Sequence, residues 1–116
     1  MAFETHTEGA LVANGSEQTV TEANEPMRFS GYISLGQMQA GDSIVLRQYV
    51  ELAGTYEKYA EETYSDAQSV PMIYFTPKEV ASSLKVTLEQ TVGTFREFPF
   101  KFIKELEAIP AATFSV

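Results

Sequence analysis

The sequence predicts an all-β domain, an antiparallel β-sandwich of about eight strands. Apolar and polar side chains alternate with a period of two in residues 27–35, 44–52 and 84–92, which is typical of strands that have one buried face. Turn-forming Gly, Pro and Asn residues separate these segments. The length of 116 residues and the hydrophobic fraction of 44% are those of one ordinary folded domain.

The first 15 residues are expected to form an amino-terminal arm. They are mostly small and polar, they contain a candidate short strand at residues 10–13, and they end at the dipeptide Asn14-Gly15, which favours a tight turn. A second strand is expected at residues 16–22, which are rich in Thr and Val. The sequence Asn24-Glu25-Pro26 then ends it, because proline cannot donate a ladder hydrogen bond.

The longest and clearest strands follow. Residues 27–35 alternate strictly, and residues 43–53 form the longest predicted strand after the turn signal Gly41-Asp42. Residues 55–64 are predicted as an outer strand, although the segment 56–62 is also compatible with a helix.

Prolines delimit the next segment. Residues 70–75 lie between Pro71 and Pro77, so we expect a short or edge strand there. Residues 77–82 are then predicted to form a surface loop or a single helical turn.

Two further strands are predicted at residues 84–92 and 95–103, with Gly93 in the turn between them and Phe98, Phe100 and Phe102 on one face of the last strand. The predicted organisation is an arm at residues 1–15, a sandwich at 16–104 and a carboxy-terminal tail at 105–116.

Composition excludes several classes of protein. A formal charge of −8 would repel a phosphate backbone, so nucleic-acid binding is disfavoured. The absence of cysteine rules out disulfides, thiolate metal sites and a cysteine nucleophile. No segment approaches the roughly 20 apolar residues of a membrane span, and the amino terminus lacks a signal-type basic or apolar stretch. We therefore expect a protein made and kept without secretion.

Catalytic and metal-binding chemistry has little support in the sequence. His6 is the only histidine, too few for a histidine metal site or a serine–histidine–acid triad. The acidic cluster Glu57, Glu61, Glu62 and Asp66 lacks an Asp-x-Asp-x-Asp-Gly calcium loop and is expected to be a solvated face. An enzyme is the least expected class, and no catalytic residue, cofactor or metal ligand is assigned.

Four sequence segments, taken in order, resemble a family of small proteins encoded among the virion genes of tailed bacteriophages. These segments are 15–19, 32–47 with its Gly41-Asp42, 67–71 with Ala67-Gln68 before Pro71, and 86–99 with Thr87-Leu88-Glu89-Gln90-Thr91-Val92-Gly93-Thr94. The resemblance covers residues 15–104. It implies a non-enzymatic virion structural protein similar to the jelly-roll cement or decoration proteins on the outside of the phage head, made in the host cytoplasm and bound to the major capsid protein.

A cement protein grips neighbouring capsid subunits through exposed tips and terminal arms. We therefore predict that partners bind at three places: the amino-terminal arm around Phe3, the predicted loop with Pro77, Lys78 and Val80, and the apolar tail with Ile109, Phe114 and Val116. The alternative is that the two ends are simply frayed. Copies of the chain are also possible partners, as a dimer or trimer, because an edge strand at 70–75 is able to pair between copies.

Two other functions stay open. A phage tail or fibre component, or a host-glycan-binding module, would use the same sandwich and bind through Tyr56, Tyr59 and Tyr64, since aromatic rings stack on sugar faces. A major capsid protein with a single jelly roll is less expected, because 116 residues is short for building a closed shell.

Overall fold

A computed structural model describes residues 2–80 and 82–106 of the chain. Within these residues the protein is all-β and contains eight strands and no helix. The strands are β1 (Ala2–Val12), β2 (Gln18–Ala23), β3 (Met27–Ser34), β4 (Ser43–Leu52), β5 (Thr55–Ser65), β6 (Met72–Val80), β7 (Leu84–Val92) and β8 (Glu97–Leu106). Residues 56–62, whose sequence is compatible with a strand or a helix, therefore belong to strand β5.

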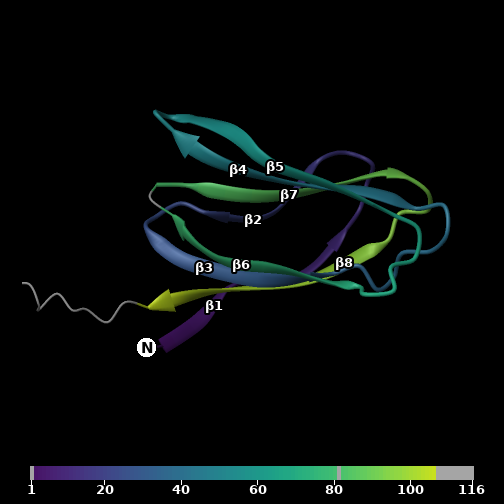
Figure 1. Cartoon of the computed structure of the whole chain (residues 1–116), viewed down its shortest axis with the longest axis horizontal. Coiled ribbons are helices and arrows are strands. Elements are labelled where there is room, and N and C mark those ends of the chain that lie inside the picture. The colour runs from purple at the N-terminus through teal and green to yellow at the C-terminus, as the bar shows by residue number, and fades with distance from the viewer. Residues whose placement is uncertain (1, 81, 107–116) are drawn as a thin grey trace, which may run out of the picture.

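The strands form two antiparallel four-stranded sheets that face each other, with β2, β7, β4 and β5 in the upper part of Figure 1 and β1, β8, β3 and β6 in the lower part. The strand orders are β1-β8-β3-β6 and β2-β7-β4-β5. The chain passes from one sheet to the other at every connection except the one between β4 and β5. The resulting strand order is that of an eight-stranded jelly roll. The predicted antiparallel sandwich of about eight strands is confirmed.

Alternate side chains of both sheets fill the core, as the sequence pattern predicted. Phe29, Ile33 and Leu35 from the β3 region are buried, and so are the inward side chains of β7 (Leu84, Val86, Leu88 and Gln90). On β8 the predicted phenylalanine face is confirmed, because Phe98 and Phe102 are completely buried and Phe100 packs against the core. A period of two therefore places one apolar set of each of these strands between the sheets.

The predicted amino-terminal arm is corrected by strand β1. Residues 2–12 pair along the whole of β8, from Ala2 opposite Leu106 to Val12 opposite Glu97. The side chains of β1 are mostly exposed, and this edge strand buries little apolar surface of its own. Its backbone hydrogen bonds to β8 make it a strand, and such bonds leave no periodic signal in a sequence.

The predicted loop at residues 77–82 is also wrong up to residue 80, because strand β6 continues to Val80. The register with β3 shifts between Phe29 and Gly31, so that Thr76 and Pro77 lie opposite the single residue Ser30. Such a bulge on an edge strand tolerates proline, whose missing N–H weakens no ladder there. The expectation that this segment is an edge strand is confirmed.

Polar contacts fasten two other regions of the sandwich. On the β1/β2 side, the Thr7 and Thr21 hydroxyl groups are 2.8 Å apart and His6 Nε2 lies 2.9 Å from the Glu22 carbonyl. Near the β3–β4 connection, the buried Asp42 carboxylate accepts hydrogen bonds from Gln39 N, Thr94 N and Arg96 Nε. These contacts join segments that lie far apart in the sequence.

Candidate binding face on the β1-β8-β3-β6 sheet

The outer face of the β1-β8-β3-β6 sheet carries several large, exposed apolar side chains. The register places a set of large apolar and aromatic side chains on the side away from the core, and five of them are exposed: Phe3, Val12, Tyr32, Met72 and Tyr74. Large exposed apolar side chains that gather on one face often mark interaction sites in soluble proteins. We call this surface the apolar face.

A hollow of about 500 Å³ lies in the apolar face, toward the end of the sheet where β1 begins and β8 ends. Phe3, Tyr32, Tyr74, Pro77 and Ile103 form its apolar walls. Ser30 lies opposite Ile103 on the neighbouring strand and opposite the β6 bulge, and its short side chain leaves the space that a larger residue would fill. The hollow therefore follows from a small residue beside a bulge.

Tyr32 and Tyr74 form an aromatic pair at one wall of the hollow. They are direct cross-strand neighbours on β3 and β6, their ring centroids are 4.9 Å apart, and their planes differ by 32°. Each ring is about half exposed. Paired tyrosines offer a large apolar contact area with few side-chain torsions to order on binding, which suits recognition.

Charged groups surround this apolar centre. Arg28 Nε lies 3.8 Å from both Glu79 Oε2 and Glu105 Oε1, so this cation is shared by carboxylates of two neighbouring strands. Lys101 lies at the wall of the hollow and forms no ion pair with any residue in the described ranges. An apolar centre with a charged rim is the usual anatomy of a protein-binding surface.

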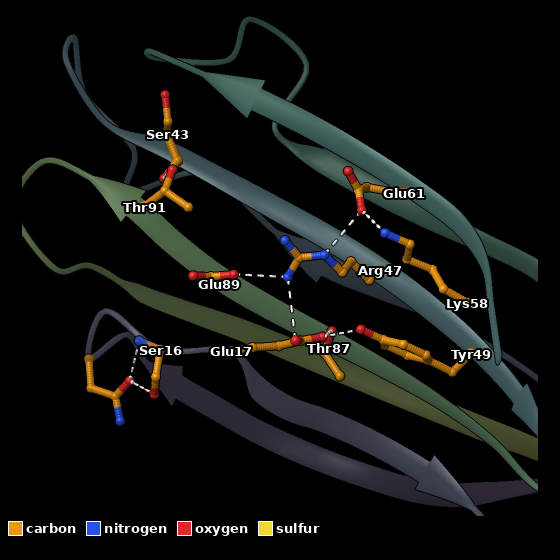
Figure 2. Close-up of polar contacts among 11 residues, drawn as sticks. Ser16, Glu17, Ser43, Arg47, Tyr49, Lys58, Glu61, Thr87, Glu89 and Thr91 are labelled. Atoms are coloured by element: carbon orange, nitrogen blue, oxygen red, sulfur yellow. Dashed lines mark hydrogen bonds and ion pairs between the residues drawn. The ribbon is translucent and has the colours of Figure 1, made fainter. Parts of the chain in front are cut away.

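The outer face of the other sheet has the opposite character. Figure 2 shows Arg47 of β4 pointing toward three carboxylates, with its guanidinium 2.9 Å from Glu89, 3.1 Å from Glu61 and 3.5 Å from Glu17. The hydroxyl groups of Tyr49 and Thr87 each donate a 2.6 Å hydrogen bond to Glu17. The polar groups of this network thus satisfy one another.

The protonation of this network favours its charged form. The hydrogen bond to Glu89, together with Glu61 and Glu17, raises the pKa of Arg47 above its ordinary value despite partial burial. Burial alone would raise the pKa of Glu17, but hydrogen bonds from Thr87 and Tyr49 and the charge of Arg47 outweigh it and lower that pKa. Arg47 and its partners therefore form a closed, ionised network on this face, whereas the apolar face exposes Phe3, Tyr32 and Tyr74.

Two of the partner-binding residues predicted from the sequence, Phe3 and Pro77, meet at the hollow although 74 positions separate them. Lys78 does not join them, because it lines a different groove between β5 and β6. Val80 does not line the hollow, and its side chain is only 4% exposed and packs in the core. Ile109, Phe114 and Val116 lie outside the described residues.

The tyrosines considered for glycan binding do not form one platform. Tyr56 lies on the outer face of its sheet, where its hydroxyl donates to Glu22 and Lys85 Nζ sits 4.6 Å from its ring centroid. Tyr59 and Tyr64 instead line the groove of about 480 Å³ between β5 and β6. The three rings are therefore divided between two surfaces.

Tyr32, Tyr74 and Ile103 were not identified from the sequence as binding residues. Tyr32 occupies an outward position of the alternating segment 27–35. This position was the one sequence feature that could have indicated an exposed aromatic side chain. Its significance depends on the pairing of β3 with β6 and β8, which brings Tyr74 and Lys101 beside it.

Comparisons with known proteins assign no family to the chain, since no family model, curated protein or solved structure matches it significantly. The described residues contain no cluster of three or more metal-ligating side chains suited to an ion. No helix in residues 2–80 or 82–106 is long and apolar enough to cross a membrane.

Proposed function

We propose that this chain is a non-enzymatic virion structural protein, a capsid cement or decoration protein that binds the outside of a phage head. In this proposal the apolar face contacts neighbouring major capsid subunits. The observation that carries it is the contrast between the two outer faces, one a closed ionic network and the other an exposed apolar surface with an aromatic hollow.

Two further arguments support a virion role. The strand order is that of the jelly roll, a fold common in viral capsid proteins, although this argument rests on analogy between folds. The sequence resemblance to small virion proteins of tailed phages is independent of that analogy and covers most of the sandwich.

The physical task of a cement protein suits such a surface. A protein that binds only the assembled shell stabilises it by mass action, and it does so more strongly as its affinity rises. Affinity at protein interfaces comes mainly from a few central aromatic and apolar residues surrounded by a polar rim. Phe3, Tyr32 and Ile103 would supply that centre, with Lys101 and Arg28 at the rim.

The test is co-sedimentation of the purified chain with expanded heads, unexpanded shells and free capsid subunits. We expect saturable binding to expanded heads only, weakened at least about tenfold by Phe3→Ser or Tyr32→Ser, a loss of about 1.4 kcal/mol. Leu52→Ser is the matched control, because Leu52 is equally exposed but belongs to the other sheet. A chain that ends at residue 108 measures separately whether the predicted tail contacts contribute.

Two results would contradict this proposal. Absence of binding to every form of the shell would remove the cement role. Binding that survives both apolar-face substitutions but is lost in the chain that ends at residue 108 would place the binding contacts in the tail and not on the apolar face.

The alternative function is a phage tail or fibre component, or a host-glycan-binding module. The observation that favours it is the Tyr32–Tyr74 pair beside Ser30, since adjacent aromatic rings and a hydroxyl suit a sugar ring better than the divided Tyr56, Tyr59 and Tyr64. A glycan array separates the two functions. Specific glycan binding that is lost in Tyr32→Ser, together with no binding to heads, would establish the alternative.

A further inference from the structure

We propose that two copies of this chain pair through the free edge of β6, antiparallel and about a two-fold axis at Tyr74. The pairing would join the two β1-β8-β3-β6 sheets into one continuous sheet. The inference is independent of the proposed function, because it concerns the chain alone.

The four edge strands of the sandwich differ in how they are protected. β1, β2, β5 and β6 are the sheet edges. Charged side chains usually prevent an exposed edge from pairing with another chain. The first three edges carry such charges, at Glu4 and Glu8, at Glu22, and at Glu57, Lys58, Glu61 and Glu62.

The edge of β6 lacks this protection over its first five residues. The sequence from Met72 to Thr76 is Met-Ile-Tyr-Phe-Thr, with no charge and with high β-propensity. In a chain of net charge −8, two copies that meet along Met72–Thr76 bring no charged side chains of this segment against each other, since the charges of β6 lie beyond it at Lys78 and Glu79.

The positions of the prolines indicate a second copy as the occupant. Pro71 and Pro77 are each three residues from Tyr74. In an antiparallel pair centred on Tyr74, Tyr74 therefore faces its own mate, Ile73 faces Phe75, Met72 faces Thr76, and each proline falls opposite a proline at the end of the ladder. Proline is harmless at that position and would interrupt pairing in most other registers.

The chemistry of the two sides of β6 also matches this register. Met72, Tyr74 and Thr76 are exposed, while Ile73 is partly buried and Phe75 is buried. Pairing about Tyr74 keeps exposed residues opposite exposed residues. It also brings the Tyr32–Tyr74 pair of each copy against that of the other, so that the two apolar faces become continuous.

A two-fold pairing closes at the dimer, because the same edge is used by both partners. A five-residue ladder is smaller than a standard protein interface, so we expect a reversible dimer in the micromolar range. Sedimentation velocity of the full chain over a range of concentrations measures it. We expect Tyr74→Lys to weaken the dimer at least about tenfold, because like charges then face each other, and Leu52→Lys to leave it unchanged.

Single-cysteine variants locate the axis, since the natural chain contains no cysteine. Directly opposed residues on paired strands have Cβ atoms about 4.5–5.5 Å apart, close to the separation a disulfide needs. Under mild oxidation Tyr74→Cys should form a disulfide-linked dimer much faster than Leu52→Cys, whose exposed side chain lies on the other sheet. A monomer at every concentration, or a dimer in which Tyr74→Cys cross-links no faster than Leu52→Cys, would overturn the proposal.

Discussion

The Asp42 carboxylate occupies the space that a side chain at Gly93 would need. A Cβ added to Gly93 would overlap Asp42 Oδ1 and come within 2.8 Å of Asp42 Cα. Asp42 precedes β4 and Gly93 follows β7, and Asp42 also accepts hydrogen bonds from Thr94 N and Arg96 Nε. The close approach of these two residues therefore fixes how the β7–β8 turn packs on the β3–β4 connection.

The first prediction is that Gly93→Ala destabilises the protein by about 3 kcal/mol or more. The backbone of Gly93 has a φ of +96°, which costs an alanine about 1–2 kcal/mol, and the overlap with Asp42 adds a packing cost. Urea unfolding followed by circular dichroism measures the change in the free energy of unfolding.

Gly54→Ala is the matched control for Gly93→Ala. Gly54 has a similar φ of +82°, but an added Cβ meets no atom within 4 Å. We expect it to cost only the backbone term of about 1 kcal/mol. Equal losses in the two variants would show that the contact with Asp42 contributes nothing.

The second prediction concerns Gly31, which lies in the middle of β3 beneath the ring of Phe102. An added Cβ would come within 2.7 Å of Phe102 Cγ and would also meet the Lys101 carbonyl oxygen. We expect Gly31→Ala to lower the free energy of unfolding by about 3 kcal/mol. In Gly9→Ala the new Cβ meets Phe100 only at 3.6 Å, so this control on β1 should be neutral or slightly stabilising. A stable Gly31→Ala protein would contradict the packing described here.

Much of the fold was predictable because its core strands carry their own signal. In β3 and β7 the buried set alternates in the sequence itself, so Phe29, Ile33, Leu84 and Val86 could be assigned to one face without any knowledge of their partners. The pattern in β8 worked for the same reason, with Phe98 and Phe102 buried.

The errors lie where an edge strand depends on its neighbour. β1 has few apolar residues to alternate and is a strand because β8 offers it a hydrogen-bonding partner. β6 passes through Pro77 by means of a bulge, and whether a proline ends a strand or lies in a bulge depends on the partner's register. The candidate hollow has the same limitation, since Phe3 and Pro77 could each be chosen from the sequence but their meeting required the strand order.

The third prediction tests the network on the outer face of the other sheet. Arg47→Met keeps an apolar stem but leaves the carboxylates of Glu17, Glu61 and Glu89 without their shared cation. Because these groups are partly exposed, we expect a loss of only about 1 kcal/mol in the free energy of unfolding at low salt. The difference from the natural chain should shrink in roughly 1 M NaCl, which screens both the attraction and the repulsion. A loss that does not change with salt would mean that Arg47 acts through packing alone.

The fourth prediction is that the protein loses stability in acid, and that Asp42 is a main cause. Hydrogen bonds from Gln39 N and Arg96 hold the pKa of Asp42 below its ordinary value of 3.8 in the folded state, even though burial opposes them. A group whose pKa is lowered by folding stabilises the folded state fully above its unfolded pKa, and the contribution is lost as the pH falls through the folded pKa. Glu17, whose pKa is lowered from 4.5, acts in the same direction.

The free energy of unfolding should therefore decrease as the pH is lowered below about 4.5. Asp42→Asn should be less stable than the natural chain by about 3 kcal/mol near pH 7, because an amide cannot accept from three donors and leaves Arg96 without its carboxylate. Once Asp42 is protonated in the natural chain, its advantage over the variant is reduced, so the two stabilities should converge as the pH falls below 3.8 and through the lower folded-state pKa of Asp42. Urea unfolding of both proteins across this range measures the convergence, and Asp66→Asn, at an exposed carboxylate that accepts from Gly41 N, is the control. A difference between the natural chain and Asp42→Asn that stays constant with pH would show that Asp42 stabilises the fold by its shape and not by its charge.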